Sequence, residues 1–99
     1  MPLDITEYSQ MAVDAAGRLL PAGKEPGAYQ TPVAIGAGSV QSAAFGGQAA
    51  FVRLHADAAC RIAFGANPTA SSSTPRMAAG ATEFFGVTPG HKVAVIASA

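Results

Sequence analysis

Three kinds of side chain in this sequence have the types and spacing that chemistry would need: a thiol, an imidazole and a carboxylate. Cys60 lies five residues after His55, across a tight turn at Asp57, and a cysteine nucleophile needs a nearby base of this kind. However, Cys60 shares a strand face with Ile62, and on an apolar face a free thiol packs like a small hydrophobic side chain. We therefore expect Cys60 to be a core residue. His55 and Asp57 are expected to be a strand-end residue and a turn residue, without an acid–base role.

The segment Ile35-Gly-Ala-Gly-Ser has the glycine spacing that begins a phosphate-binding loop. A dinucleotide site also requires a third glycine three residues after the second, and a helix that offers its N-terminal amides. Position 41 is glutamine instead, and residues 39–45 have the pattern of a strand, so a hairpin turn is the better interpretation. Histidine, aspartate and glutamate do not recur at metal-ligand spacing either. The sequence therefore predicts a protein that is not an enzyme and has no catalytic, cofactor-binding or metal-binding residues.

The composition predicts one domain with a thin hydrophobic core. The chain has 99 residues, near the usual size of a single domain, and 49% of them are apolar, but 23 are alanines. Hydrophobic stabilisation scales with buried apolar area, at roughly 25 cal/mol per Å², so a methyl group contributes little. Only 12% of the residues are charged, which is a weak sign that other subunits cover much of the surface. We expect a homo-oligomer, a dimer or a trimer, that stabilises a marginal fold.

Six basic and six acidic residues give a formal net charge of zero. Nucleic acids and anionic membranes bind concentrated basic faces, so neither is expected as a partner. The first ten residues lack the basic and apolar regions of a secretory signal, which predicts an intracellular protein at synthesis. Three basic residues, Arg53, Arg61 and Lys92, fall on outward positions of predicted strands. They are expected to form either a solvated face or a stripe that contacts an acidic partner.

Short period-two patterns dominate from residue 31 onward and predict strands rather than helices. For example, Val52, Leu54 and Ala56 share one face, and turn signals such as Pro89-Gly90 separate the segments. The sequence predicts an all-β fold, a single antiparallel β-sandwich or jelly-roll-like barrel of about seven strands. The predicted strands are 31–35, 39–45, 49–56, 59–64, 75–78, 82–87 and 91–97.

The first 30 residues are expected to form an N-terminal arm or outer hairpin on a sandwich core of residues 31–99. Segments 7–13 and 18–20 predict the two strands of this hairpin. The sequence Asp-Ala-Ala-Gly at 14–17 between them suits a type I turn, which favours Asp first and Gly fourth.

A short helix is the alternative for this region, from Thr6 or Tyr8 to Gly17, because alanines permit it. Residues 21–27 contain two prolines and two glycines and are expected to be an irregular connector. The Ser/Thr run within 65–75 is expected to be a mobile surface loop between two strands, not a linker between two domains.

Large apolar side chains occupy both faces of two predicted strands. Phe84 and Phe85 are adjacent, so they must point to opposite faces, and Phe51 faces away from Val52 in the same manner. Such a strand either has both faces covered or presents one face to an interface. Core packing explains only half of these positions, and the other half favours a protein that works by association.

The layout of the chain resembles a group of small structural proteins of tailed bacteriophages and prophages. The segments that carry this resemblance are VDAAGRLLPAG, GSVQSAAF, FVRL, CRIAFG, NPTA, EFFGV and PGHKVAVI, which together cover most of the chain. Proteins that look like this are β-sandwich modules that coat or cement the capsid shell, or sit in tails and fibres. The matching segments are structural, so the resemblance transfers no functional residue.

The expected function is therefore that of a capsid decoration or cement protein on the exterior of the virion, assembled in the host cytoplasm. Its expected partner is the major capsid protein, whose neighbouring subunits it would bridge. The alternative is a tail or fibre module that recognises a glycan on the host surface. The candidate interface anchors are the aromatic residues Tyr8, Tyr29, Phe51, Phe84 and Phe85.

Overall fold

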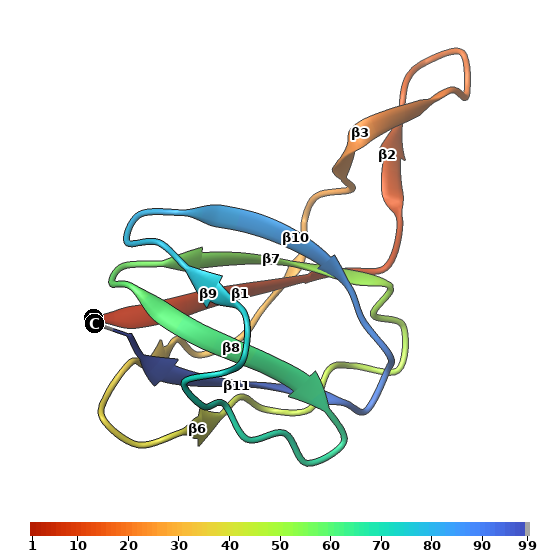
Figure 1. Cartoon of the computed structure of the whole chain (residues 1–99). Coiled ribbons are helices and arrows are strands. Elements are labelled where there is room, and N and C mark those ends of the chain that lie inside the picture. The colour runs from red at the N-terminus through yellow and green to blue at the C-terminus, as the bar shows by residue number, and fades with distance from the viewer. Residues whose placement is uncertain (99) are drawn as a thin grey trace.

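The computed structural model describes residues 1–98, which form eleven β-strands and no helix. Two sheets of five and four strands make up the body, and a separate two-stranded ribbon projects from it (Figure 1). The strands are β1 (Pro2–Tyr8), β2 (Met11–Val13), β3 (Leu19–Gly23), β4 (Ala28–Tyr29), β5 (Val33–Ala34), β6 (Val40–Gln41), β7 (Phe51–Ala56), β8 (Cys60–Gly65), β9 (Arg76–Met77), β10 (Thr82–Gly86) and β11 (Lys92–Ala97). All pairs are antiparallel. The all-β prediction is confirmed, but there are more strands than predicted and neither sheet closes into a barrel.

β1 lies inside the first sheet, whose strand order is β10-β7-β1-β4, with β5 also paired to β1. Leu3 and Ile5 alternate with polar neighbours, so period two turns both side chains inward, where they are buried. The predicted boundary between an arm and a core is therefore wrong, because residues 2–8 and 28–29 belong to the body. Only residues 11–23 extend outside it.

The second sheet has the strand order β6-β11-β8-β9. The segments predicted as strands 31–35 and 39–45 contain only two strand residues each, in β5 and β6. Pro32 and Gly36 limit β5, whereas residues 42–45, after β6, contain neither proline nor glycine. Beyond β6 the chain still follows β11, although irregularly. There, the backbone N–H of Ser42 donates to the carbonyl of Val93 at 2.8 Å.

The loop between β8 and β9 follows the predicted order of strand, loop and strand, but it is tied to the second sheet. Gln41 Nε2 donates to the carbonyl of Pro68 at 2.8 Å, and Arg61 Nη1 donates to the carbonyl of Thr74 at 2.9 Å. These hydrogen bonds fasten the Ser/Thr segment, which was expected to be mobile, to β6 and β8.

The core lies between the two sheets. Val52, Leu54 and Ala56 point inward from β7, as the alternation predicted, and Cys60 and Ile62 point inward from β8. The other buried members of this cluster are Leu3, Ile5, Val33, Phe45, Ala49, Met77, Val93 and Val95. Only two members of this cluster are alanines, so the core is built mainly from valine and larger side chains and not from the alanines that dominate the composition.

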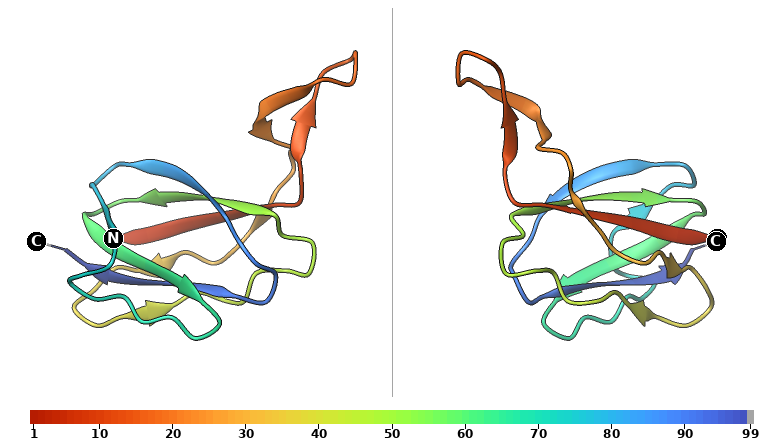
Figure 2. Two further views of the ribbon diagram at one scale, coloured as in Figure 1. Left: turned by 45° about the vertical axis from the view of Figure 1, so that its right-hand side comes forward. Right: turned by 180° about the vertical axis from the view of Figure 1, so that it is seen from behind.

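β2, β3 and the turn between them, residues 11–23, form a ribbon that we call the arm (Figures 1 and 2). Gly17, with φ of 81°, donates its N–H to the carbonyl of Asp14 at 3.0 Å, and Asp14 donates its own N–H to the carbonyl of Arg18 at 2.8 Å. The left-handed conformation at Gly17 suits glycine because it lacks a Cβ. The alternative helix over this region is wrong, and 21–23, expected to be connector, lie in β3.

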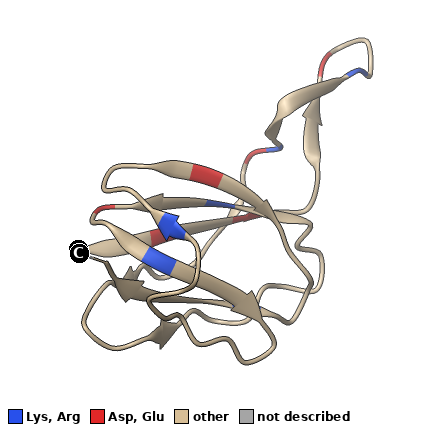
Figure 3. Ribbon diagram, viewed as in Figure 1, with Lys and Arg blue, Asp and Glu red and all other residues tan. Residues whose placement is uncertain are grey.

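The thickness of the body separates one of the three basic residues expected to lie together from the other two. Arg53 lies on the outer face of the first sheet, since it is next to inward-pointing Val52 and Leu54. Arg61 and Lys92 lie in the second sheet, near opposite ends of the β8–β11 pair. Figure 3 shows charges scattered over the strands and the arm. A continuous basic stripe over these three strands is therefore excluded.

Candidate binding surface at the base of the arm

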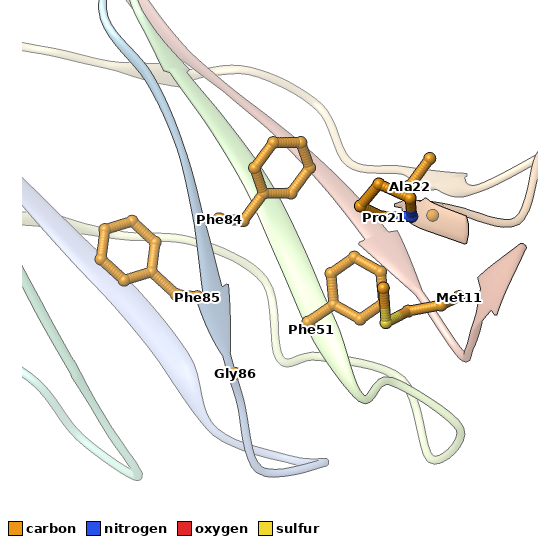
Figure 4. A pocket seen from close by; sticks show the side chains of 8 residues that line it. Met11, Pro21, Ala22, Phe51, Phe84, Phe85 and Gly86 are labelled. Carbon is orange, nitrogen blue, oxygen red and sulfur yellow. The ribbon is translucent and has the colours of Figure 1, made fainter. Parts of the chain in front are cut away.

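An apolar hollow of about 360 Å³ lies where the arm meets the first sheet (Figure 4). The arm forms one side of it, and β7 and β10 form the other. The residues that line it are Met11, Pro21, Ala22, Gly23, Phe51, Phe84, Phe85 and Gly86. None of these side chains carries a charge, so the hollow suits an apolar side chain better than a charged or strongly polar ligand.

Strand pairing brings two of the predicted anchors together here. In the register of β10 and β7, Phe84 lies opposite Arg53, and Gly86 lies opposite Phe51. Since side chains alternate along a strand, Phe51 and Phe84 share the outer face, with ring centroids 6.4 Å apart. Gly86 has no side chain, so one flank of the Phe51 ring stays open to the hollow.

Tyr8 extends this aromatic row toward the start of the arm. Its ring stacks on Phe51, with centroids 5.2 Å apart and planes inclined by 24°. Phe84, at the other end, is 57% exposed, whereas Tyr8 is buried. The aromatic row Tyr8–Phe51–Phe84 therefore begins at a buried ring, Tyr8, and ends at an exposed ring, Phe84, that another molecule could contact.

Phe85 points the opposite way. It packs against the core cluster, and its ring centroid lies 5.1 Å from that of Phe64. Figure 4 shows its ring directed away from those of Phe51 and Phe84. Core packing thus accounts for Phe85, and Phe84 is the member of the pair that faces outward.

Tyr8 and Tyr29 meet at a residue that sequence reasoning did not single out, Glu25. Tyr8 Oη donates to Glu25 Oε2 at 2.7 Å, and Tyr29 Oη donates to Glu25 Oε1 at 3.3 Å. The backbone N–H of Gly27 donates to Oε1 at 3.0 Å. The hydrogen bond from Tyr8 holds the pKa of Glu25 below its ordinary value, and the same bond raises the pKa of Tyr8. We call these three side chains the Glu25 clamp; a glutamate in a Gly- and Pro-rich connector gave no sequence signal for it.

The histidine and carboxylate considered for chemistry lie on the outer face of the first sheet, apart from the thiol. His55 Nδ1 is 2.8 Å from Thr82 Oγ1, and His55 Nε2 is 3.6 Å from Asp57 Oδ1. Cys60 is fully buried between the sheets, and burial raises the pKa of its thiol, which disfavours the reactive thiolate. The structure therefore does not bring Cys60 and His55 together, and the prediction that Cys60 is a core residue is confirmed.

The arm exposes apolar side chains along its length, a feature that sequence reasoning missed. Leu19 is 71% exposed and Val13 is 53% exposed, and Met11 and Leu20 are exposed as well. The sequence did contain a sign of this exposure. Leu19 and Leu20 are adjacent in a predicted strand of only three residues, and their side chains must point to opposite faces. A two-stranded ribbon has little stability of its own in water, so these side chains are positioned to be covered by something else.

Residues 1–98 contain no cluster of three His, Cys, Asp or Glu side chains placed to hold a metal ion. Within the same range no helix is long and apolar enough to cross a membrane. The glycines of 35–39 lie between β5 and β6, and the part of the chain that the structure describes has no helix after them. No family model matches the sequence, and no curated protein or solved structure is significantly similar to it.

Proposed function

We propose that this protein is a virion structural protein of a tailed bacteriophage, a decoration or cement protein that binds the exterior of the assembled head shell. The observation that carries this proposal is the arm, residues 11–23, which projects from the body and exposes apolar side chains. A projecting ribbon that cannot bury its own side chains is suited to reach between neighbouring subunits of a larger assembly. The major capsid protein is the proposed partner.

The physical mechanism is passive bridging. Burying an exposed leucine or valine contributes on the order of 1.5–3 kcal/mol, so the arm offers a modest interface in each copy. Many copies on one shell act together, and their contacts add to resistance against internal pressure. The ion pair of Arg18 Nε with Asp14 Oδ2, at 3.4 Å, lies in the turn of the arm, where both side chains are largely open to solvent.

The hollow provides the second half of the proposed contact. It is open, apolar and bounded by Phe51 and Phe84, so it can receive one apolar side chain from the capsid surface while the arm extends past it. Buried aromatic anchors of this kind dominate the energy of many interfaces. Two sheets with one core between them support the finer assignment of a two-layer β-sandwich, which we propose as the scaffold for this contact.

The test uses expanded head shells assembled from the major capsid protein of the same phage in the absence of this protein. The wild-type protein is added, and bound protein is measured by co-sedimentation and cryo-electron microscopy. We expect regular binding and a higher rupture temperature of the shells. The variant Leu19→Asp adds a charge to the exposed arm and is expected to lower the occupancy at least tenfold.

A matched control keeps this test specific. Ala66→Asp introduces the same charge on an exposed loop residue far from the arm in the sequence, and it is expected to bind as the wild type does. Equal loss for both variants would indicate a general effect of charge, and undiminished binding by Leu19→Asp would refute the role of the arm. Failure of the wild-type protein to bind refutes the shell proposal itself.

One observation favours the alternative of a tail or fibre module that recognises a glycan. The Tyr29 ring is 70% exposed beside the Glu25 carboxylate, and sugars stack on such rings while donating hydroxyl protons to carboxylates. The hollow bounded by Phe51 and Phe84 is apolar, however, and offers few polar groups to orient a sugar. A glycan-array signal that disappears in Tyr29→Ala would favour this alternative over shell binding.

A further inference from the structure

One open sheet edge differs from the others in the body. The edge strands β4, β5, β6 and β9 have only two residues each, and short edge strands are a common protection against unwanted pairing. β10 has five residues, contains no proline, and pairs with β7 on one side only. It is therefore the longest open edge strand of the body, with Glu83 as its one charged residue, and it carries the most exposed phenylalanine, Phe84.

The register shows which backbone groups of β10 remain unpaired. The N–H of Ala56 donates to the carbonyl of Ala81 at 3.0 Å, and the N–H of Val87 donates to the carbonyl of Ala50 at 3.0 Å. Bonded residues alternate along an antiparallel strand, so 83 and 85 also bond to β7. The N–H and C=O groups of Thr82, Phe84 and Gly86 consequently point outward, away from β7.

This edge is complementary to a copy of itself. If two β10 strands pair antiparallel about a two-fold axis at Phe84, then Phe84 lies opposite Phe84 of the second copy, and Thr82 lies opposite Gly86 of the second copy. All the outward groups then find partners, giving a continuous sheet across both copies. The two exposed phenylalanine rings meet on the outer face, where aromatic cross-strand pairs stabilise a sheet.

Charge placement permits the same pairing. Glu83 is the one charged residue of β10, and in this register it lies opposite Phe85 of the second copy, so two carboxylates do not face each other. Gly86 lines the hollow, so the segment of the second copy opposite it comes to the hollow's rim. Among the described residues the arm pairs only within itself and forms no backbone hydrogen bond with β10, so it does not occupy this edge.

We propose that β10 is a dimerisation edge, through which a second copy of this chain adds its own β10 antiparallel with Phe84 at the two-fold axis. This inference does not rest on shell binding, because it concerns the free protein in solution. In this dimer the apolar Phe84 side chain contacts the Phe84 ring of the second copy.

Sedimentation equilibrium and amide hydrogen exchange by NMR, measured together over a range of protein concentrations, test the proposal. The mass is expected to rise with concentration from 9.8 kDa toward twice that value. Over the same range, exchange at Thr82, Phe84 and Gly86 is expected to slow. The amides of Glu83 and Phe85 bond within the chain and are expected to be protected at every concentration, which provides an internal control.

Two matched substitutions locate the interface. Phe84→Lys places a charge at the two-fold axis, opposite its own copy, and is expected to weaken dimerisation at least tenfold. Leu19→Lys makes the same change at an exposed position on the arm and is expected to leave the dimer intact. Continued protection of Glu83 and Phe85 in Phe84→Lys shows that the body is folded.

Three results would overturn the proposal. One is a mass that remains at 9.8 kDa at the highest concentration reached. Another is a dimer in which exchange at Thr82, Phe84 and Gly86 does not change with concentration. The third is a dimer that Leu19→Lys dissociates and Phe84→Lys does not, because that outcome assigns the interface to the arm.

Discussion

The Glu25 carboxylate connects the returning leg of the arm to the end of β1. It accepts hydrogen bonds from Tyr8, Tyr29 and the Gly27 backbone, and each of these bonds favours the ionised carboxylate. Its pKa is consequently lower in the folded protein than the ordinary value of 4.5. A group of this kind adds stability above its unfolded pKa, and that stability is lost as the pH falls through the folded pKa.

We expect the stability of the wild-type protein to fall between neutral pH and pH values below 4.5 by more than that of Tyr8→Phe, which lacks the strongest donor to Glu25. At alkaline pH the direction of the effect is opposite, and stability falls as the pH rises. The raised pKa of Tyr8 means that stability is lost as the pH rises above the ordinary value of 10.0. Urea denaturation of both proteins across this pH range measures the difference, and parallel pH profiles would contradict the clamp.

For single residues, the sequence predicted to which side of a sheet most strand side chains point, because this alternation depends only on the local sequence. Phe51 and Phe84 lie on the outer face and Cys60 in the core, as the pattern indicated. Glu25 could not be found in this way. Its role depends on Tyr8, which is 17 residues away along the chain, and no local period encodes that contact.

β1 and the arm are adjacent in sequence, yet they differ in what they contribute to the fold. β1 pairs with β7 along its whole length and turns Leu3 and Ile5 into the core, whereas the arm exposes its apolar side chains. Stability should therefore be sensitive to substitutions of the buried residues of β1 and insensitive to those at exposed positions of the arm, such as Leu19.

We expect Leu3→Ala to lower the free energy of unfolding by about 2–5 kcal/mol, since it removes a fully buried side chain and leaves a cavity. Leu19→Ala makes the same chemical change at an exposed position and is expected to cost less than about 0.5 kcal/mol. Chemical denaturation of both variants makes the comparison. Similar losses in the two would mean that the arm packs on the body in solution.

Elements with strict alternation were predicted well, and those without it were not. The segments 49–56 and 91–97 are close to β7 and β11. β1 was missed because proline and polar residues within 2–8 obscured a pattern that only Leu3 and Ile5 reveal. β5 and β6 were predicted too long. Pro32 and Gly36 end regular pairing around β5, and the pattern of residues 42–45 does not show that regular pairing ends at Gln41.

The whole molecule combines a small core with surfaces that expose apolar groups. Its buried cluster has thirteen members, most of them valine, leucine and isoleucine, and a domain of this size has a free energy of unfolding of only about 5–15 kcal/mol. The all-β class followed from the sequence, whereas the order of strands in the sheets did not. A period-two pattern indicates that a segment is a strand, but it does not indicate which other strand pairs with that segment in the sheet.

We expect the melting temperature to increase with protein concentration, by about 3–5 °C for each tenfold, because dimerisation draws the equilibrium toward the folded state. Phe84→Lys should melt at a lower temperature than the wild-type protein, and its melting temperature should depend less on concentration. Scanning calorimetry over two decades of concentration checks both statements. A flat dependence for the wild-type protein would show that the monomer supplies all of the stability.

The close approach of Gly23 to Tyr8 has a consequence for evolution. A Cβ on Gly23 would lie 2.5 Å from Tyr8 Cδ1, and the stacked Phe51 leaves the Tyr8 ring little room to retreat. The Tyr8 ring thus fixes the position of the base of the arm. The molecule is 47 Å long, so the arm extends well beyond this contact. A small rotation at the base of the arm produces a larger displacement at its tip. One added methyl group at Gly23 would therefore change the direction in which the arm leaves the body, while the apolar side chains of the arm stayed the same.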